Sequence, residues 1–204
     1  MASFQTRILL TGFEAFLGET MNPSQEIVLH LAAKLQCDGL ILPVSFERSA
    51  DLLRRHLLNN SYDYILMLGQ AGKRSKISLE RTAVNLIKTS VADEDGAHPV
   101  EQKIVAEGPE AIRSSLPLEE WLSQLQKKQW PVEISDSAGE FVCNHLYYQI
   151  QTDIQQRKVS AKPLFIHVPY LPAQALSKPE GTASMDLETM VLVIEELIQI
   201  ISRG

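Results

Sequence analysis

Cys143 combines a reactive side chain with a position at which it could do chemistry. It stands in "SDSAGEFVCNHLYYQI" (135–150), after a turn-rich run and in a pattern that predicts a helix beginning near Gly139 or Glu140. In the first turn of a helix, unpaired N–H groups and the helix dipole favour a thiolate and could stabilise an oxyanion. Free cysteine is also among the most buried residue types, so a packed core thiol is the competing interpretation.

A cysteine nucleophile needs a base that takes its proton, and histidine titrates in a suitable range. His167 interrupts an otherwise apolar strand, "PLFIHVPY" (163–170), near its carboxyl end, so it is either a satisfied core histidine or a catalytic one. His145 is near Cys143 in sequence, but two helical positions separate the pair by about 200° around the axis. The other histidines lie in helical patterns or in an acidic loop: His30, His56 and His98.

The third member of such a site is a carboxylate or amide that orients the imidazole. Glu80 stands in the weakly charged stretch "GQAGKRSKISLERTAVNL" (69–86), where a salt bridge with Arg81 or another arginine is the alternative. Gly69 and Gly72 end the preceding apolar strand and indicate either an ordinary turn or a loop that contacts substrate. They do not form a phosphate loop, because the Gly-Lys-Ser/Thr ending is absent.

The elements that position these residues are predicted from an alternation of apolar runs and helical patterns. The predicted strands are 7–13, 40–44, 64–69, 77–86, 130–135 and 163–170, and the predicted helices are 22–36, 49–60, 117–129, the one near 139 or 140, and 185–202. Asn22 and Pro23 suit the start of the first helix, Gly39 is placed to end it, and 89–102 reads as a loop. The pattern predicts one domain, 1–204, with a three-layer α/β/α sandwich around a mostly parallel open sheet. In such sheets the chemistry lies outside the carboxyl ends of the strands.

Composition excludes several classes of function. The chain has 204 residues, 45% of them hydrophobic, and a formal net charge of −6, which argues against a nucleic-acid interface. The first residues lack a secretory pattern, and the apolar run near the end is cut by Glu195 and Glu196, so we expect a cytoplasmic protein without a membrane span. Cys37 and Cys143 are too far apart for a zinc spacing, and no histidine pair has ligand spacing, so neither a metal nor a cofactor is expected.

Four segments in order, "LLTGFEAFLGETMNPS", "LGQAGKRSKISLERTAVN", "SDSAGEFVCNHLYY" and "FIHVPYLP", run nearly end to end along the chain. They resemble the motifs of the pyroglutamyl-peptidase I family (pyrrolidone-carboxylate peptidases), cytoplasmic cysteine peptidases that remove an N-terminal pyroglutamyl residue. The resemblance implies that Cys143 is the nucleophile, that His167 is the general base and acid, and that Glu80 positions His167. It also implies a pyroglutamyl pocket at Phe13, Phe16, Asn22, Gln70, Phe141 and Val142.

The resemblance further implies an omega-peptidase that forms an acyl-thioester with N-terminally pyroglutamylated peptides and assembles as a dimer or tetramer. The chain departs from the family at residues 13–18, where Phe-x-Pro-Phe-Gly-Gly is usual, and at Ser90, where the family often has an arginine thought to help the oxyanion site. The second departure bears on rate and pocket closure more than on reaction class. Two alternatives stay open: a degenerate homologue that binds such peptides without cleaving them, and an α/β phosphorylase or hydrolase of another class, with Lys73 and Arg74 as phosphate ligands.

Overall fold

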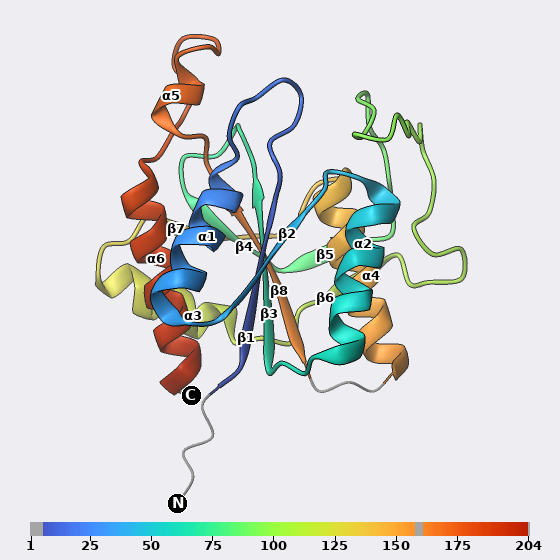
Figure 1. Ribbon diagram of the computed structural model, residues 1–204, viewed down its shortest axis with the longest axis horizontal. Helices are drawn as coiled ribbons and strands as arrows, with labels where there is room; N and C mark the ends of the chain where they lie inside the picture. The colour runs from blue at the N-terminus through green and yellow to red at the C-terminus, as the bar shows by residue number, and fades with distance from the viewer. Residues whose placement is uncertain (1–5, 158–160, 204) are drawn as a thin grey trace, which may run out of the picture.

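A six-stranded β-sheet separates two layers of helices (Figure 1). The computed structural model describes residues 6–157 and 161–203. The sheet has the strand order β2-β1-β3-β8-β4-β7. Its strands are β1 (Ile8–Phe13), β2 (Asp38–Leu42), β3 (Tyr64–Gln70), β4 (Ile77–Glu80), β7 (Val132–Ser135) and β8 (Lys162–Val168). Two short strands, β5 (Thr82–Val84) and β6 (Ala111–Arg113), form a separate antiparallel pair.

Four neighbouring strands, β2, β1, β3 and β8, run parallel, and their carboxyl ends point to the top of Figure 1. β4 runs antiparallel to β8, and β7 follows the direction of β4. The sheet is therefore mostly parallel, as the alternation of strands and helices predicts, with two reversed strands at one edge. The reversal matters for the site because it sets the Glu80 end of β4 beside Phe165, two residues before His167 on β8.

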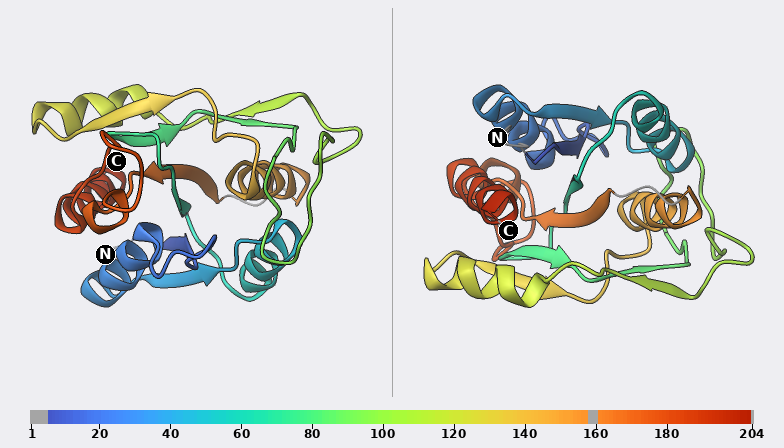
Figure 2. Two further views of the ribbon diagram at one scale, coloured as in Figure 1. Left: turned by 90° about the horizontal axis from the view of Figure 1, so that it is seen from above. Right: turned by 90° about the horizontal axis from the view of Figure 1, so that it is seen from below.

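The helices cover both faces of the sheet, as the view along the layers shows (Figure 2). Their bounds are α1 (Pro23–Leu35), α2 (Phe46–Asn59), α3 (Leu118–Lys127), α4 (Val142–Arg157), α5 (Pro172–Ala175) and α6 (Leu187–Arg203). α1, α3 and α6 pack on one face, and α2 and α4 pack on the other. No helix in the described part of the chain is long and apolar enough to cross a membrane.

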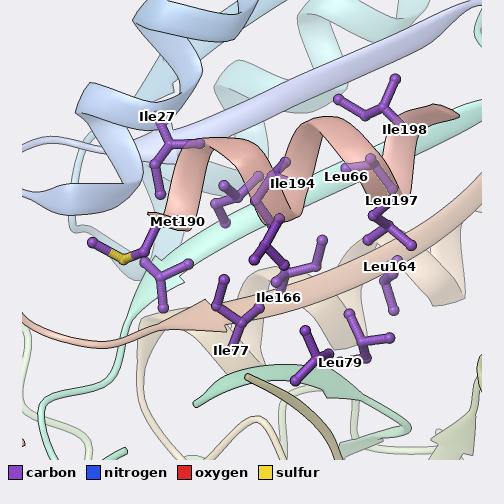
Figure 3. Packing of buried hydrophobic residues seen from close by; sticks show 14 of the residues in the cluster. Ile27, Leu66, Ile77, Leu79, Leu164, Ile166, Met190, Ile194, Leu197 and Ile198 are labelled. Atoms are coloured by element: carbon purple, nitrogen blue, oxygen red, sulfur yellow. The ribbon is translucent and has the colours of Figure 1, made fainter. Parts of the chain in front are cut away.

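α6 shows how the sequence pattern builds the first of these cores. Its side chains Met190, Ile194 and Leu197 lie against Leu66 of β3 and Ile166 of β8 (Figure 3). The spacing of three to four residues places them on one face of the helix. Each of these side chains is fully buried, and such burial contributes about 1.5–3 kcal/mol per residue.

Several local predictions differ from the structure. α2 begins at Phe46 and not near Ser49, because Ser45 is extended and its hydroxyl accepts a hydrogen bond from the Arg48 amide. α1 ends at Leu35 with Gln36 as a left-handed cap (φ 53°), so Gly39 does not end it. Gly39 instead lies in β2, where a Cβ would stand 2.9 Å from that of Ala32. The single strand predicted over 77–86 is two strands, β4 and β5, in different sheets.

Candidate active site

Cys143 is the second residue of α4, which begins at Val142. The first turn is closed by a hydrogen bond from the His145 amide to the carbonyl of Phe141. The side chain of Asn144 fixes this end of the helix, because it accepts a hydrogen bond from the Val84 amide and donates one to the Val84 carbonyl. The N–H groups of the first turn, that of Cys143 among them, have no carbonyl partner within the helix. The thiol is thus held at a helix N-terminus, as the sequence predicts, although the helix begins at Val142 and not near Gly139 or Glu140.

Gly69 brings the thiol next to the sheet. A Cβ on Gly69 would stand 2.8 Å from Cys143 Sγ, so only glycine leaves room for the sulfur at this point of β3. Gly69 is the register partner of His167 on the neighbouring strand β8. The helix and the two strands therefore bring Cys143 and His167 to the same region of the fold, although the two residues are far apart in the sequence.

His167 and Glu80 form a buried pair. The distance between His167 Nδ1 and Glu80 Oε1 is 2.7 Å, and the two residues are 5% and 0% exposed. The Tyr147 hydroxyl donates a hydrogen bond to the backbone carbonyl of Glu80, which fixes the end of β4 from α4. Since Nδ1 faces the carboxylate, Nε2 is the ring nitrogen that stays available to other groups.

Arg74 is a second partner of the same carboxylate. Its Nη1 lies 2.8 Å from Glu80 Oε1, and its Nη2 donates a hydrogen bond to the Ser137 carbonyl. The sequence alone does not decide whether Arg81 or another arginine pairs with Glu80. Arg81 points elsewhere, to Glu119 and Asp136.

A cavity of about 130 Å³ opens over the thiol and the imidazole. Both Cys143 and His167 line it, and so do all six predicted pocket residues: Phe13, Phe16, Asn22, Gln70, Phe141 and Val142. The remaining lining residues are Val44, Ala138, Gly139 and Glu140. The Phe16 and Phe141 rings stack with centroids 6.4 Å apart. Most of the cavity wall is thus apolar, and the thiol and the imidazole form part of it.

Two amides in this wall have different freedom to bind a ligand. Asn22 is 1% exposed, its Oδ1 accepts hydrogen bonds from the Ser24 amide and hydroxyl, and its Nδ2 donates to the Glu14 carbonyl. Its polar atoms therefore serve mainly to hold the 14–22 loop. In Gln70, Oε1 accepts a hydrogen bond from Gln174, so the Nε2 group remains the donor that can face the cavity.

The surroundings of the thiol raise its pKa, whereas the helix N-terminus alone would lower it. Burial raises the pKa of Cys143 to about 12, and the charge of Glu80 adds to this increase. The backbone amide of Cys143 and the charge of Arg74 lower this pKa, but by less. The thiolate expected from the helix dipole alone is therefore not the resting form at neutral pH, because desolvation outweighs the dipole.

Several sequence candidates lie away from this cavity. His145 is buried against Phe46, with ring centroids 5.4 Å apart, and it does not line the cavity. Ser90 is exposed in the segment that follows β5 and is not part of the wall. Cys37 follows α1 at the far end of that helix from Asn22. Among the described residues, no group of three or more His, Cys, Asp or Glu is placed to hold a metal ion.

The sequence model of the pyroglutamyl peptidase family matches residues 6–204. The chain belongs to the pyroglutamyl peptidase family. A pyrrolidone-carboxylate peptidase of Bacillus cereus is 37% identical over 197 residues, which are 95% of this chain and 91% of the relative. Another, of Bacillus licheniformis, is 38% identical over 190 residues, 91% of this chain and 87% of the relative.

Solved structures of the same family share the fold. The pyrrolidone carboxyl peptidase of Fervidobacterium islandicum AW-1 superimposes with a TM-score of 0.94 at 33% identity, covering 98% of this chain and 99% of that one. The pyroglutamyl peptidase I of Bacillus amyloliquefaciens gives a TM-score of 0.89 at 33% identity, covering 97% and 96%. The family resemblance that rests on the four sequence motifs is thereby confirmed, and an unrelated α/β phosphorylase is ruled out as the family of this chain.

Three residues that support the site carry no clear signal in the sequence. Asn144 ties α4 to β5, Tyr147 ties α4 to β4, and Gln174 joins α5 to Gln70 and to the carbonyl of Met21. Each bond links segments that are more than fifty positions apart, so no local pattern predicts it. An amide or hydroxyl inside an otherwise apolar helix is the one available signal, because buried polar groups need partners.

Proposed function

We propose that this protein hydrolyses the amide bond after an N-terminal pyroglutamyl residue, by way of an acyl-thioester on Cys143. The observation that carries the proposal is the small cavity that joins Cys143 and His167 to an apolar wall. Membership of the pyroglutamyl peptidase family supports the same activity. The relatives named above carry the name pyrrolidone-carboxylate peptidase, which agrees with it.

The cavity suits the chemistry of the pyroglutamyl group. This group is a flat, uncharged lactam without a free amine, so apolar walls can hold the ring while few polar groups bind it. Four side chains supply apolar surface: Phe13, Phe16, Phe141 and Val142. The Nε2 group of Gln70 can donate a hydrogen bond to the lactam carbonyl. Proline has the same ring size but no lactam carbonyl, and it would leave that donor unpaired. Discrimination by a missing partner can reach roughly 10⁴-fold.

In the proposed mechanism, His167 acts as base toward a thiol that is neutral at rest. While its Nδ1–H donates a hydrogen bond to Glu80, His167 takes the thiol proton on Nε2 as the sulfur attacks the scissile carbonyl. The oxyanion is stabilised by N–H groups of the first turn of α4, which have no carbonyl partner in the helix.

The same imidazole then completes both halves of the reaction. The imidazolium gives its proton to the leaving amine, and the shortened peptide departs from the acyl-thioester. A water molecule, deprotonated by His167, attacks the thioester carbonyl, and the sulfur leaves and recovers a proton. Pyroglutamate is released, and the thiol and the neutral imidazole are restored.

The resemblance also supports a homo-oligomer of two or four copies that acts in the cytoplasm on N-terminally pyroglutamylated peptides. Light scattering on the purified protein measures the number of copies. A pyroglutamyl amide with a chromogenic leaving group, compared with the matching prolyl amide, tests the activity. We expect turnover of the first substrate alone by reduced protein and almost none by Cys143→Ser. A folded, reduced protein that turns over no pyroglutamyl amide would contradict the proposal.

A further inference from the structure

The side chain of Arg74 bridges two parts of the site. Arg74 lies in the loop between β3 and β4, and its Nη1 is 2.8 Å from Glu80 Oε1. Its Nη2 donates a hydrogen bond, 3.2 Å long, to the carbonyl of Ser137, in the segment that leads into α4. One guanidinium thus joins the carboxylate behind His167 to the chain that precedes Cys143.

Glu80 depends on this cation. The Glu80 side chain is completely buried, while that of Arg74 is 23% exposed. Oε1 of Glu80 contacts both Arg74 and His167, and Oε2 has no hydrogen-bond partner among the described residues. While His167 is neutral, Arg74 is the positive charge in contact with the carboxylate. A buried charge that loses its partner is strongly unfavourable.

We propose that Arg74 is a positioning residue that acts through Glu80: it balances the charge of the carboxylate and holds it in place, and so leaves His167 free to serve as the base. This inference rests on the proposed function and assigns it a further residue. Arg74 itself does not line the cavity.

The other groups around the cluster do not replace this charge. From α4, the Tyr147 hydroxyl contacts the Glu80 carbonyl and Cys143 faces the cavity. From β7, Glu133 accepts a hydrogen bond from Ser78, the register partner of His167. Glu140 lies on the cavity wall. All four are neutral or negative, so the loss of Arg74 leaves a net negative cluster that binds protons more readily.

The direction of the expected effect follows from this charge. In Arg74→Gln, a proton on the imidazole becomes the remaining means of balancing Glu80, so the free base is formed only at higher pH. The acidic limb of kcat/KM should move to higher pH by about one unit or more, because a nearby positive charge that disfavours the protonated imidazole has been removed. The loss should appear in kcat more than in KM. Arg74→Lys, which keeps the charge, should restore most of the wild-type profile.

Arg81 provides a matched control. It is the next residue after Glu80, yet its guanidinium binds Glu119 and Asp136 at 2.7 and 3.1 Å, and its side chain is 21% exposed. Arg81→Gln removes the same charge from almost the same exposure. We expect this variant to keep the wild-type pH profile.

A double-mutant cycle tests the route through Glu80 and avoids a buried unpaired charge. In a Glu80→Gln background, Arg74→Gln should change kcat/KM by less than about twofold, because the group through which it acts is gone. Equal effects of Arg74→Gln in both backgrounds, or an unshifted pH profile in folded Arg74→Gln, would overturn the inference while the wild type remains active. A wild type that cleaves no pyroglutamyl amide would instead overturn the proposed function.

Discussion

Gly69 lies directly beneath the thiol of Cys143, so that a Cβ on this glycine would stand 2.8 Å from Sγ and 2.9 Å from the ring of Phe165. The same glycine is paired in register with His167. The close approach of α4 to the sheet therefore depends on a missing side chain at one position of β3. The sulfur reaches the sheet beside the strand that carries His167, because no side chain occupies this point between β3 and α4.

Gly69→Ala should move the sulfur and so remove activity out of proportion to stability. A displacement of about 1 Å at a reacting atom can cost roughly 10²-fold in rate. Gly39→Ala is the matched control: its Cβ would stand 2.9 Å from that of Ala32, equally tight but far from the cavity. We expect both variants to melt earlier and only Gly69→Ala to lose most of its kcat. Full activity in folded Gly69→Ala would contradict the placement of the thiol.

The two cysteines should differ in function. Cys143→Ser should be nearly inactive, because a serine hydroxyl ionises far less readily than a thiol. Cys37 follows α1 away from the cavity, with its sulfur 4.0 Å from the Leu31 carbonyl. Cys37→Ser should therefore keep the wild-type kcat, and iodoacetamide should inactivate it as completely as the wild type. Comparable losses in the two serine variants would show that Cys37 contributes to the site.

Alkylation of Cys143 should respond to pH as a thiol with a raised pKa does. Burial raises its pKa to about 12, so the thiolate fraction in the free protein grows throughout the neutral and moderately alkaline range. In Cys37→Ser, the rate of reaction with iodoacetamide should still increase between about pH 7 and pH 10, roughly tenfold per unit. A rate that is already constant above pH 7 would mean that a thiolate is the resting form.

Glu80 should orient His167 without reacting. Glu80→Gln has the same shape, and its amide NH₂ can occupy the place of Oε2, which has no partner among the described side chains. It can still accept a hydrogen bond from His167 but loses the charge that stabilises the imidazolium. We expect kcat to decrease, but to remain about 10²-fold higher than that of Cys143→Ser. Equal losses in the two variants, with folding intact by circular dichroism, would assign Glu80 a more direct part.

The fold is largely readable from the sequence because apolar strands and amphipathic helices leave periodic patterns. The end of α1 is an instructive exception, since Gly39 has the residue type of a helix terminator but serves β2, where it lets Ala32 approach. Its role depends on a neighbour that only the folded chain brings near. The reversal of β4 has the same origin, because strand direction is decided by how distant segments pair.

The site is readable in part. Cys143 and His167 stand out because a thiol near a helix start and a histidine at a strand end break the local pattern. The partner of Glu80 does not stand out: Arg74 and Arg81 are equally plausible in the sequence, and only the fold directs one inward and the other to Glu119. The raised pKa of the Cys143 thiol also cannot be predicted from the sequence, because burial is a property of the folded state.

His145 should contribute to stability and not to catalysis. Burial and the nearby charge of Arg54 lower its pKa to about 4, so the folded protein disfavours the charged ring. The unfolded chain takes up this proton as the pH falls below about 6.5, and the folded protein does so only near 4. The stabilising effect is therefore complete above about pH 6.5 and is lost as the pH decreases toward 4, by up to roughly 3 kcal/mol. In His145→Gln, the melting temperature should depend less on pH across this window.

The activities of the histidine variants should then follow the geometry and not the sequence distance. His145 lies two positions from Cys143 but packs against Phe46 away from the cavity, whereas His167 lines the cavity and pairs with Glu80. We expect His145→Gln to keep most of its kcat at pH 7.5, and His167→Gln to lose about as much as Cys143→Ser, because both remove a member of one reacting unit. Circular dichroism at the assay pH checks that both variants are folded. If His145→Gln were inactive and His167→Gln active, the base of this site would have to be reassigned, and the pairing of His167 with Glu80 would be purely structural.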